Sequence, residues 1–226
     1  MNLISIILKI SITFLIAKVL IKIIRKLGFK TNISSYIKGK LGEMKVRSIL
    51  KDVKEKYKNS YLINDVLYGN SQIDHILLIN NIALVVETKN IKGEISGTTT
   101  LNKVSVRKPF SFDTYTMYNP ILQNKGHVEE FKRQLRKSTG SEYEVLNIVY
   151  FVNKRKRKIK IESNEKENIF IVNSRKDIIK ILKKKVKDIN KTKYDNKKLG
   201  KYLKSVGKYS RKEIKEHNRR IQELYC

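Results

Sequence analysis

The centre of the chain, from Gln72 to Asn90, reads QIDHILLINNIALVVETKN. It holds two runs of Ile, Leu and Val, and the Asn80-Asn81 pair between them is typical of a tight turn. A third run, YLINDVLY, precedes it from Tyr61 to Tyr68. The sequence therefore predicts a meander of three strands.

Helical and strand patterns alternate on both sides of this meander. Apolar residues recur at helical spacing in three segments: residues 37–53, 119–138 and 174–186. Ser174, followed by Asp177 three residues later, is typical of the start of a helix. Runs rich in Ile, Val and Thr predict a hairpin and two strands: residues 91–107, 145–152 and 169–172. This order predicts an α/β fold in which helices flank a mixed sheet.

The chain is strongly basic. Its 226 residues include 50 Lys and Arg against 21 Asp and Glu, and the formal charge of +29 favours a polyanionic partner. Hydrophobic residues make up 40%, which is enough to build a core. The single cysteine, Cys226, excludes an intrachain disulfide and a zinc site built from several thiolates. Basic residues are densest after Lys154, and the spacing of Leu199 and Leu203 predicts that this extension is partly helical.

Residues 3–24 form an apolar segment interrupted by Lys9 and Lys18. Its length suits a membrane-spanning helix, because about 20 apolar residues cross a hydrocarbon core. An amphipathic helix lying on anionic lipid is the alternative. Several positive charges follow on the C-terminal side: Lys18, Lys22, Arg25, Lys26 and Lys30. The positive-inside rule then predicts a single-pass protein of the cell membrane, with its N-terminus outside and its body in the cytoplasm.

Acidic residues and a lysine gather where the central strands end. Glu87 and Lys89, two residues apart on a strand, share one face, and a neighbouring strand brings Asp74 beside them. Two converging carboxylates repel unless a cation lies between them, and a hard divalent ion bound by oxygen atoms fits that position. Lys89 would then orient a water or stabilise charge on a phosphate. The pattern indicates phosphodiester hydrolysis, with the basic surface holding nucleic acid.

The acidic residues and the histidines also have interpretations that involve no catalysis. An isolated Asp followed by Glu-x-Lys is usually a solvated charge pattern, but the apolar run of residues 84–86 argues against an exposed strand here. His75 and His127 are interpreted as buried histidines near the site, because the carboxylates already suit magnesium.

The spacing of Asp74, Glu87 and Lys89 resembles the PD-(D/E)xK nuclease signature, with Ile73 in place of the proline. Further motifs accompany it: Gly39-Lys40-Leu41-Gly42-Glu43, Gln72-Ile73-Asp74-His75, Glu87-Thr88-Lys89-Asn90, Gly93 and Gly97, and Asn119-Pro120 with Gln123 and His127. Together these motifs resemble the nuclease-related domain (NERD) family over residues 37–152.

The resemblance implies a restriction-endonuclease-like core, a mixed sheet flanked by helices, that uses Mg²⁺ or Mn²⁺. Asp74 and Glu87 would be the metal ligands and Lys89 the catalytic lysine. Glu43 would assist the metal or its water, although a solvated helix residue beside basic neighbours is an equal interpretation. Gln123 would touch substrate or water.

These inferences predict one organisation of the chain. Its parts are a transmembrane anchor at 1–27, a linker at 28–36, a nuclease-like domain at 37–152, the end of the core or an accessory strand and helix at 153–189, and a basic extension at 190–226. The expected function is hydrolysis of DNA at the membrane, with RNA as a further candidate substrate. Two alternatives stay open: a non-catalytic nucleic-acid-binding module tethered to the membrane, and a scaffold that binds anionic lipid.

Overall fold

The structure is a computed structural model that describes residues 11–13, 15, 16, 18, 19, 32–139, 143–152, 155, 158–186 and 195–207. The chain forms two compact units, residues 1–41 and residues 42–226. Helix α2 (Asn32–Lys54) begins in the first unit and ends in the second. The second unit, called the domain below, contains both sheets and the candidate site.

The apolar N-terminal segment lies mostly outside the described residues. The residues between 11 and 19 that are described are helical. Within the described ranges, no helix combines the length and the apolar character needed to cross a membrane. The membrane anchor therefore stays a prediction from the sequence, as does the structure of residues 208–226.

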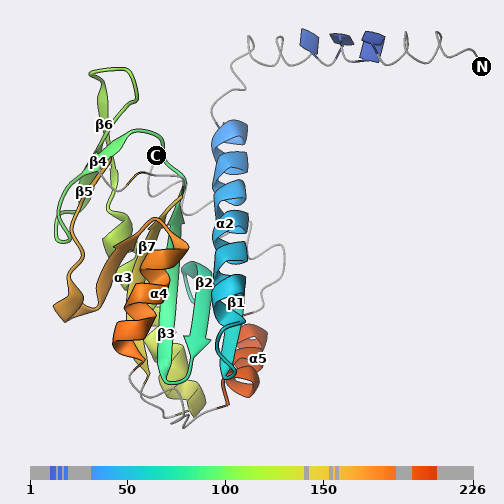
Figure 1. The fold of residues 1–226 in the computed structure, drawn as a ribbon, viewed down its shortest axis with the longest axis vertical. Helices are drawn as coiled ribbons and strands as arrows, with labels where there is room; N and C mark the ends of the chain where they lie inside the picture. Colours follow the sequence, from blue (N-terminus) through green and yellow to red (C-terminus); the bar gives the residue numbers. More distant parts are fainter. Residues whose placement is uncertain are drawn as a thin grey trace, which may run out of the picture. The chain divides into compact units, whose positions relative to one another are not determined.

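A five-stranded sheet with the order β1-β2-β3-β7-β9 lies at the centre of the domain (Figure 1). Its strands are β1 (Ser60–Tyr68), β2 (Ser71–Ile79), β3 (Ile82–Lys89), β7 (Glu144–Phe151) and β9 (Ile169–Val172). The first three strands pair antiparallel, which confirms the predicted meander, whereas β7 and β9 run parallel to β3. The chain returns from β3 to β7 through helix α3 (Pro120–Thr139), because parallel neighbours need a long crossover. The predicted mixed sheet is confirmed.

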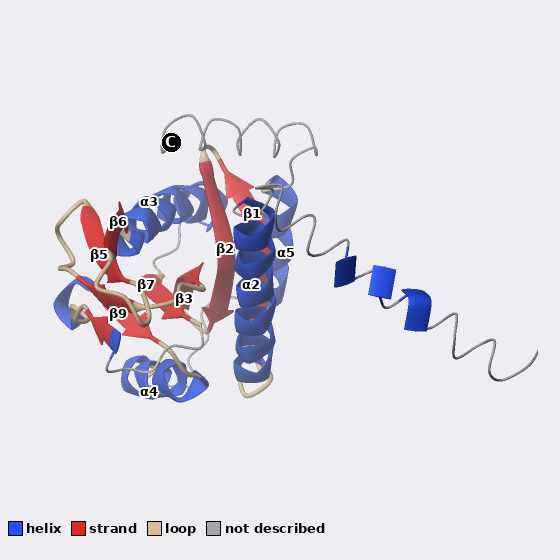
Figure 2. Ribbon diagram, turned by 90° about the horizontal axis from the view of Figure 1, so that it is seen from above, coloured by secondary structure: helices blue, strands red, loops and turns tan. Residues whose placement is uncertain are grey.

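Helices cover both faces of this sheet, with α3 and α4 (Arg175–Lys185) on opposite sides (Figure 2). Helices α2 and α4 pack on one face, with Leu50 and Leu182 in the buried cluster. Helices α3 and α5 (Asn196–Val206) pack on the other, with Phe131 and Leu203 in theirs. Because β3 is covered on both faces, its sequence is a continuous apolar run instead of an alternating one.

The core-facing side of α2 differs in part from the prediction. Val46, Leu50 and Val53 are buried, whereas Leu41 and Met44 are 57% and 61% exposed. At about 100° of rotation per residue, the three buried residues form one narrow line along the helix. Met44 points roughly 160° away from Val46, on the opposite side. The apolar residues of this segment therefore lie on two faces of the helix, and only one of these faces packs against the sheet.

A smaller sheet with the order β6-β5-β4-β8 follows β3 along the chain. Its strands are β4 (Glu94–Ser96), β5 (Lys103–Arg107), β6 (Thr114–Tyr118) and β8 (Ile159–Lys160). Strands β4 and β5 form the hairpin predicted for residues 91–107. Ile95 and Val106 pack against Phe151 of β7, so the two sheets share one buried cluster. The sequence does not predict β6, because its residues are mostly exposed and carry no apolar alternation.

The C-terminal helices begin with side-chain caps. Ser174 and Asp177 form a capping box at the start of α4, as the sequence predicts. Asp195 caps α5 by accepting hydrogen bonds from the N–H groups of Lys197 and Lys198. These caps fix where both helices start.

Helix α5 is part of the core of the domain. Leu199 and Leu203 are buried against the sheet, and the Tyr68 hydroxyl donates to the Leu203 carbonyl at 2.9 Å. Gly200 lies so close to β1 that a Cβ there would sit 2.1 Å from a ring carbon of Tyr61. Asn196 adds hydrogen bonds to the backbone of the loops below the sheet. The basic extension thus supplies one of the two helices on its face of the sheet.

Candidate functional site

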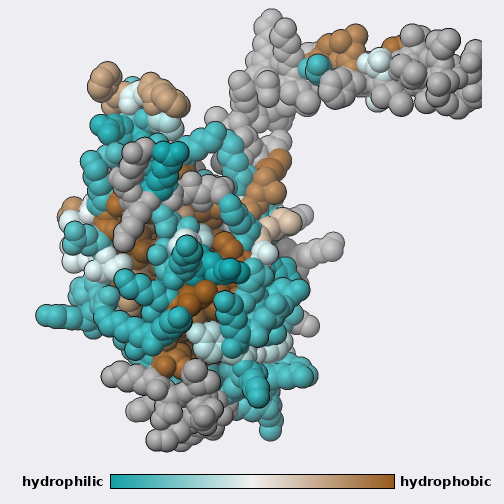
Figure 3. Space-filling view, viewed as in Figure 1, coloured by the Kyte–Doolittle hydropathy of each residue, from teal (hydrophilic) through white to brown (hydrophobic). Residues whose placement is uncertain are grey.

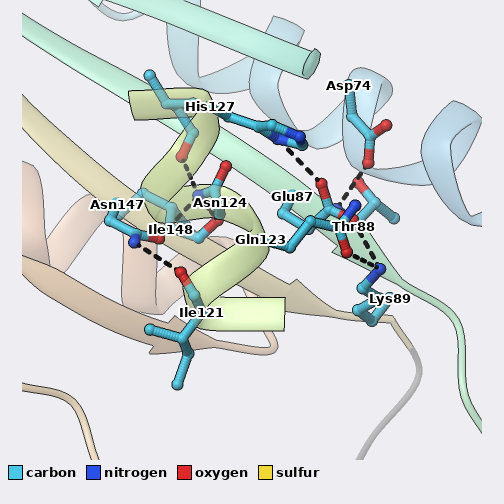
Figure 4. A network of polar contacts seen from close by, with 11 residues as sticks. Asp74, Glu87, Thr88, Lys89, Ile121, Gln123, Asn124, His127, Asn147 and Ile148 are labelled. Atoms are coloured by element: carbon cyan, nitrogen blue, oxygen red, sulfur yellow. Dashed lines mark hydrogen bonds and ion pairs between the residues drawn. The ribbon is translucent and has the colours of Figure 1, made fainter. Parts of the chain in front are cut away.

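Strands β2 and β3 separate where the candidate acidic residues begin. Their ladder ends with the pair His75 and Val86, so Asp74 and Glu87 lie just beyond the last paired residues. The Thr88 N–H, beyond the part of β3 that pairs with β2, donates to Asp74 Oδ2 at 2.8 Å (Figure 4). The open ends of two adjacent strands thus bring together carboxylates that are thirteen residues apart in the sequence.

Lys89 lies between Glu87 and the start of α3. Its Nζ is 2.7 Å from Glu87 Oε1 and donates to Gln123 Oε1 at 2.9 Å (Figure 4). Glu87 and Lys89 share one face of β3, as their spacing predicts. Glu87 is only 4% exposed, so this ion pair is shielded from water and stronger than a surface pair. The ammonium group is held in place from two elements.

The electrostatics of the site centre on Asp74. Burial raises the pKa of the Asp74 carboxyl well above its usual value, and the negative charges of Glu87 and Glu43 raise it further. The Thr88 N–H and the Lys89 ammonium act in the opposite direction without cancelling these effects. Two neighbouring carboxylates thus disfavour the charged form of Asp74 at this end of the sheet.

The third carboxylate comes from α2. Gly42 precedes Glu43 and packs directly against the residue that follows β3, because a Cβ at Gly42 would lie 2.9 Å from Asn90 Cβ. Only a residue without a side chain lets the helix come this close to the strand end. Glu43, partly buried, is thereby placed near enough to act on Asp74.

The first turn of α3 is fixed from several directions. Asn119 Oδ1 accepts from the Ile121 N–H at 3.0 Å, which is the geometry of a helix cap. The Asn119 amide group donates to the carbonyls of Thr98 and Leu101 in the loop between β4 and β5. Gln123 lies one turn further along the helix and reaches Lys89. The structure therefore brings together all five residues predicted for the site.

A buried amide network was missed by the sequence analysis. Asn124 Nδ2 lies 2.9 Å from the Val85 carbonyl, 2.8 Å from Asn147 Oδ1 and 3.1 Å from the Ile148 carbonyl (Figure 4). Asn147 Nδ2 in turn donates to the Ile121 carbonyl at 3.1 Å. These contacts hold α3 on β3 and β7 directly beside Gln123. The signal in the sequence was Asn147 itself, because an amide inside the apolar run VLNIVYFV needs a buried partner.

Of the two histidines, His127 contacts a residue of the site and His75 contacts strand β1. His127 Nδ1 lies 3.4 Å from Glu87 Oε2, one helical turn after Gln123. His75 Nδ1 is 2.8 Å from Asn64 Oδ1 on β1. Both histidines are buried, as the sequence predicts.

The donor set suits a hard cation. In the part of the chain that the structure describes, no three His, Cys, Asp or Glu side chains converge as a ready-made metal site. The candidate ligands are the carboxylates of Asp74 and Glu87, whose mutual repulsion a cation would relieve. Oxygen ligands of this kind fit Mg²⁺ or Mn²⁺ and do not fit a site built for zinc.

The fold and the site together define an α/β protein with acidic residues and a lysine at the open ends of its central strands. Residues 38–152, slightly more than half of the chain, match the family model of the nuclease-related domain. The chain belongs to the nuclease-related domain family, as its motifs predicted. No curated protein and no solved structure matches it.

Proposed function

We propose that this protein is a metal-dependent nuclease that hydrolyses phosphodiester bonds of DNA. The observation that carries the proposal is the arrangement of Asp74, Glu87 and Lys89, in which a partly buried lysine lies beside two carboxylates at the open end of a sheet. The match to the nuclease-related domain supports a nuclease-related role, and the net charge of +29 supports a polyanionic substrate. We further propose that the main sheet and its helices are a restriction-endonuclease-like core.

Asp74 and Glu87 would hold the metal ion. The N–H and the carbonyl of one strand residue point to the same edge, so the Thr88 carbonyl points to the side on which its N–H meets Asp74. That carbonyl is the natural third oxygen donor. Bound there, Mg²⁺ or Mn²⁺ would neutralise the carboxylates and lower the pKa of an attacking water.

Lys89 would position that water and stabilise the charge that develops on the phosphate. Its ammonium is held by Glu87 and Gln123 before substrate arrives, so little reorganisation is needed during the reaction. Glu43 is the remaining carboxylate near Asp74 and would accept a hydrogen bond from water at the site. Gln123 would lie on the substrate side of the site, where its hydrogen bond positions Lys89.

The test is cleavage by the full-length protein in detergent. Supercoiled, linear, single-stranded and branched DNA and RNA would be incubated with Mg²⁺, Mn²⁺ or EDTA. Glu87→Gln and Lys89→Ala are expected to lower the cleavage rate at least about 100-fold, because each removes a group acting on the transition state. Glu129→Gln and Lys132→Ala are the matched controls, since these residues form an exposed ion pair on α3, and they should retain the native rate within about two-fold.

The outcomes separate the candidate functions. Cleavage that requires metal and disappears in both site variants supports the nuclease. Binding of nucleic acid without cleavage, unchanged in both site variants, would instead indicate a non-catalytic binding module. Binding only to vesicles of anionic lipid would indicate a membrane scaffold.

We also propose that residues 3–24 anchor the protein in the cell membrane with the domain in the cytoplasm. The support is the excess of Lys and Arg directly after the apolar segment. Because Cys226 is the only cysteine, a membrane-impermeant maleimide reports the location of the C-terminus directly. Labelling is expected only after the cells are permeabilised. The control, Cys226→Ser with Asn2→Cys, should label in intact cells, and the reverse pattern would refute the orientation.

A further inference from the structure

The β5–β6 hairpin ends in a loop, residues 108–113, that exposes two phenylalanines. The side chains of Phe110 and Phe112 are 108% and 99% exposed, so neither contributes to a core. Figure 3 shows hydrophobic side chains gathered at the end of this hairpin, at the upper left of the domain. Two fully exposed aromatic residues side by side need an explanation other than packing. We call residues 108–113 the aromatic tip.

The aromatic tip is closed by its own hydrogen bonds. The Lys108 N–H donates to the Asp113 carbonyl at 2.9 Å, and the Asp113 N–H donates to Ser111 Oγ at 3.0 Å. Phe110 has a φ of 58°, a backbone conformation that bulky side chains rarely adopt. The loop therefore presents both rings from a defined, unfavourable backbone geometry, which is typical of a binding element.

The hairpin lies between the two halves of the candidate site in the chain. Strand β4 begins five residues after Lys89, and β6 ends two residues before α3, the helix that carries Gln123. The chain leaving the site also touches the base of the tip, because a Cβ at Gly93 would lie 2.2 Å from the Arg107 carbonyl. The tip is thus attached to the elements that hold the catalytic lysine.

The surroundings of the tip are basic and aromatic. A pocket of about 440 Å³ opens beside it, lined in part by Glu94, Arg107, Lys108 and Phe110. Glu94 forms ion pairs with Arg107 at 3.2 Å and Lys160 at 2.8 Å, so its charge is neutralised. Lys103 and Tyr118, both exposed, pair at the opposite end of the same hairpin. Cations beside exposed rings are the features with which proteins bind unpaired nucleic acid, the cations at phosphates and the rings against bases.

We propose that the aromatic tip binds unpaired bases of the nucleic acid, with Phe110 and Phe112 as stacking surfaces on the hairpin that lies between Lys89 and α3 in the chain. This inference rests on the proposed function and adds to it the preferred ligand, which is single-stranded or frayed nucleic acid. A hydrocarbon surface fits the tip less well, because Asp113 follows Phe112 directly and a carboxylate entering a membrane is costly.

The test measures binding without cleavage. The full-length protein in EDTA would be titrated with a fluorescent single-stranded oligodeoxynucleotide, with its blunt duplex, and with an abasic strand of equal charge. In Phe110→Ala/Phe112→Ala, affinity for the single strand is expected to fall about ten-fold or more, from loss of base stacking. Duplex affinity should change less than about two-fold, and the salt dependence should stay the same because the phosphate contacts remain. Tyr202→Ala, an exposed aromatic residue on α5, is the matched control.

A second variant reports stacking directly. The chain contains no tryptophan, so Phe112→Trp introduces a single tryptophan at the tip, whose emission can be excited separately from that of the tyrosines. Its emission should be quenched by the single strand and unaffected by the abasic strand, with native affinity retained.

The other outcomes overturn the inference. It fails if the double Ala variant binds the single strand like the native protein, if the native protein binds no nucleic acid, or if the variant loses only binding to anionic vesicles. The result is independent of turnover, because EDTA removes the metal. If binding depends on the tip but the protein cleaves no substrate, the proposed nuclease activity is refuted. The role of the aromatic tip in binding then still stands.

Discussion

Replacing Asn124 with Ala is expected to lower the free energy of unfolding by about 2–4 kcal/mol. Asn124 is fully buried, and its amide group lies within hydrogen-bond distance of three acceptors on β3 and β7. These contacts attach α3 to the main sheet beside Gln123. Their loss would also loosen the hold of Gln123 on Lys89.

The expected loss of stability follows from the number of hydrogen bonds that the Asn124 amide group can donate. An amide group carries two hydrogens, so at most two of the three contacts are full hydrogen bonds at once. Each contributes about 1 kcal/mol net, and a buried acceptor left without a donor costs about 1–3 kcal/mol. Asn124 Oδ1 has no partner among the described residues, so removing it offsets part of this loss. A cost of this size is a large part of the roughly 5–15 kcal/mol that stabilises a typical domain.

The assay is urea denaturation of the full-length protein followed by circular dichroism. Lys125→Ala is the control, because Lys125 is the adjacent, exposed residue of α3 and should change stability by less than about 0.5 kcal/mol. A loss below about 1 kcal/mol for Asn124→Ala, with an unchanged denaturant dependence, would refute the role given to the network.

Three further substitutions test the charge and the packing of the domain. Asp74→Asn should raise the melting temperature in EDTA. Folding raises the pKa of Asp74, so protonation of this carboxyl favours the folded state at a pH below its usual pKa of about 3.9. This advantage is lost as the pH rises through the pKa of the folded state. The stabilisation by Asn should therefore grow as the pH rises above the usual pKa of an Asp and shrink when Mg²⁺ is added; a constant difference would contradict the assigned repulsion. Gly200→Ala should destabilise by about 1–3 kcal/mol through its clash with Tyr61. Gly126→Ala, where a Cβ meets nothing within 4 Å, should stabilise α3 by up to about 1 kcal/mol; equal effects in urea denaturation would contradict the tight packing of α5.

The parts of the fold that could be predicted depend on local pattern. The apolar runs of β1, β2 and β3 and the turn between the last two place Asp74 and Glu87 at one end of the sheet from strand periodicity alone. The i, i+2 spacing of Glu87 and Lys89 likewise fixes their shared face. Gln123 was predicted as a site residue only from its place in the family motif. The structure shows that it contacts Lys89.

The features that escaped prediction depend on partners distant in the sequence. Asn124 meets Asn147 across 23 residues, and nothing in the periodicity of either segment selects that pairing. Strand β6 is recognised only through its pairing with β5, because its side chains are mostly exposed. The exposure of Phe110 and Phe112 is equally invisible in the sequence, where two aromatic residues between a proline and an aspartate read as an ordinary turn.

The position of α5 has a consequence for how the protein is made. Tyr68 and Leu203, which meet in the folded domain, are separated by 135 residues, so one side of the main sheet is synthesised long before the helix that covers it. During translation that apolar surface stays open to water and to other chains, which makes the nascent protein a client for chaperones. A chain cut short before residue 195 lacks this cover altogether. Such fragments are expected to be aggregation-prone and rapidly degraded, so the cell would accumulate a complete site only on molecules translated through α5.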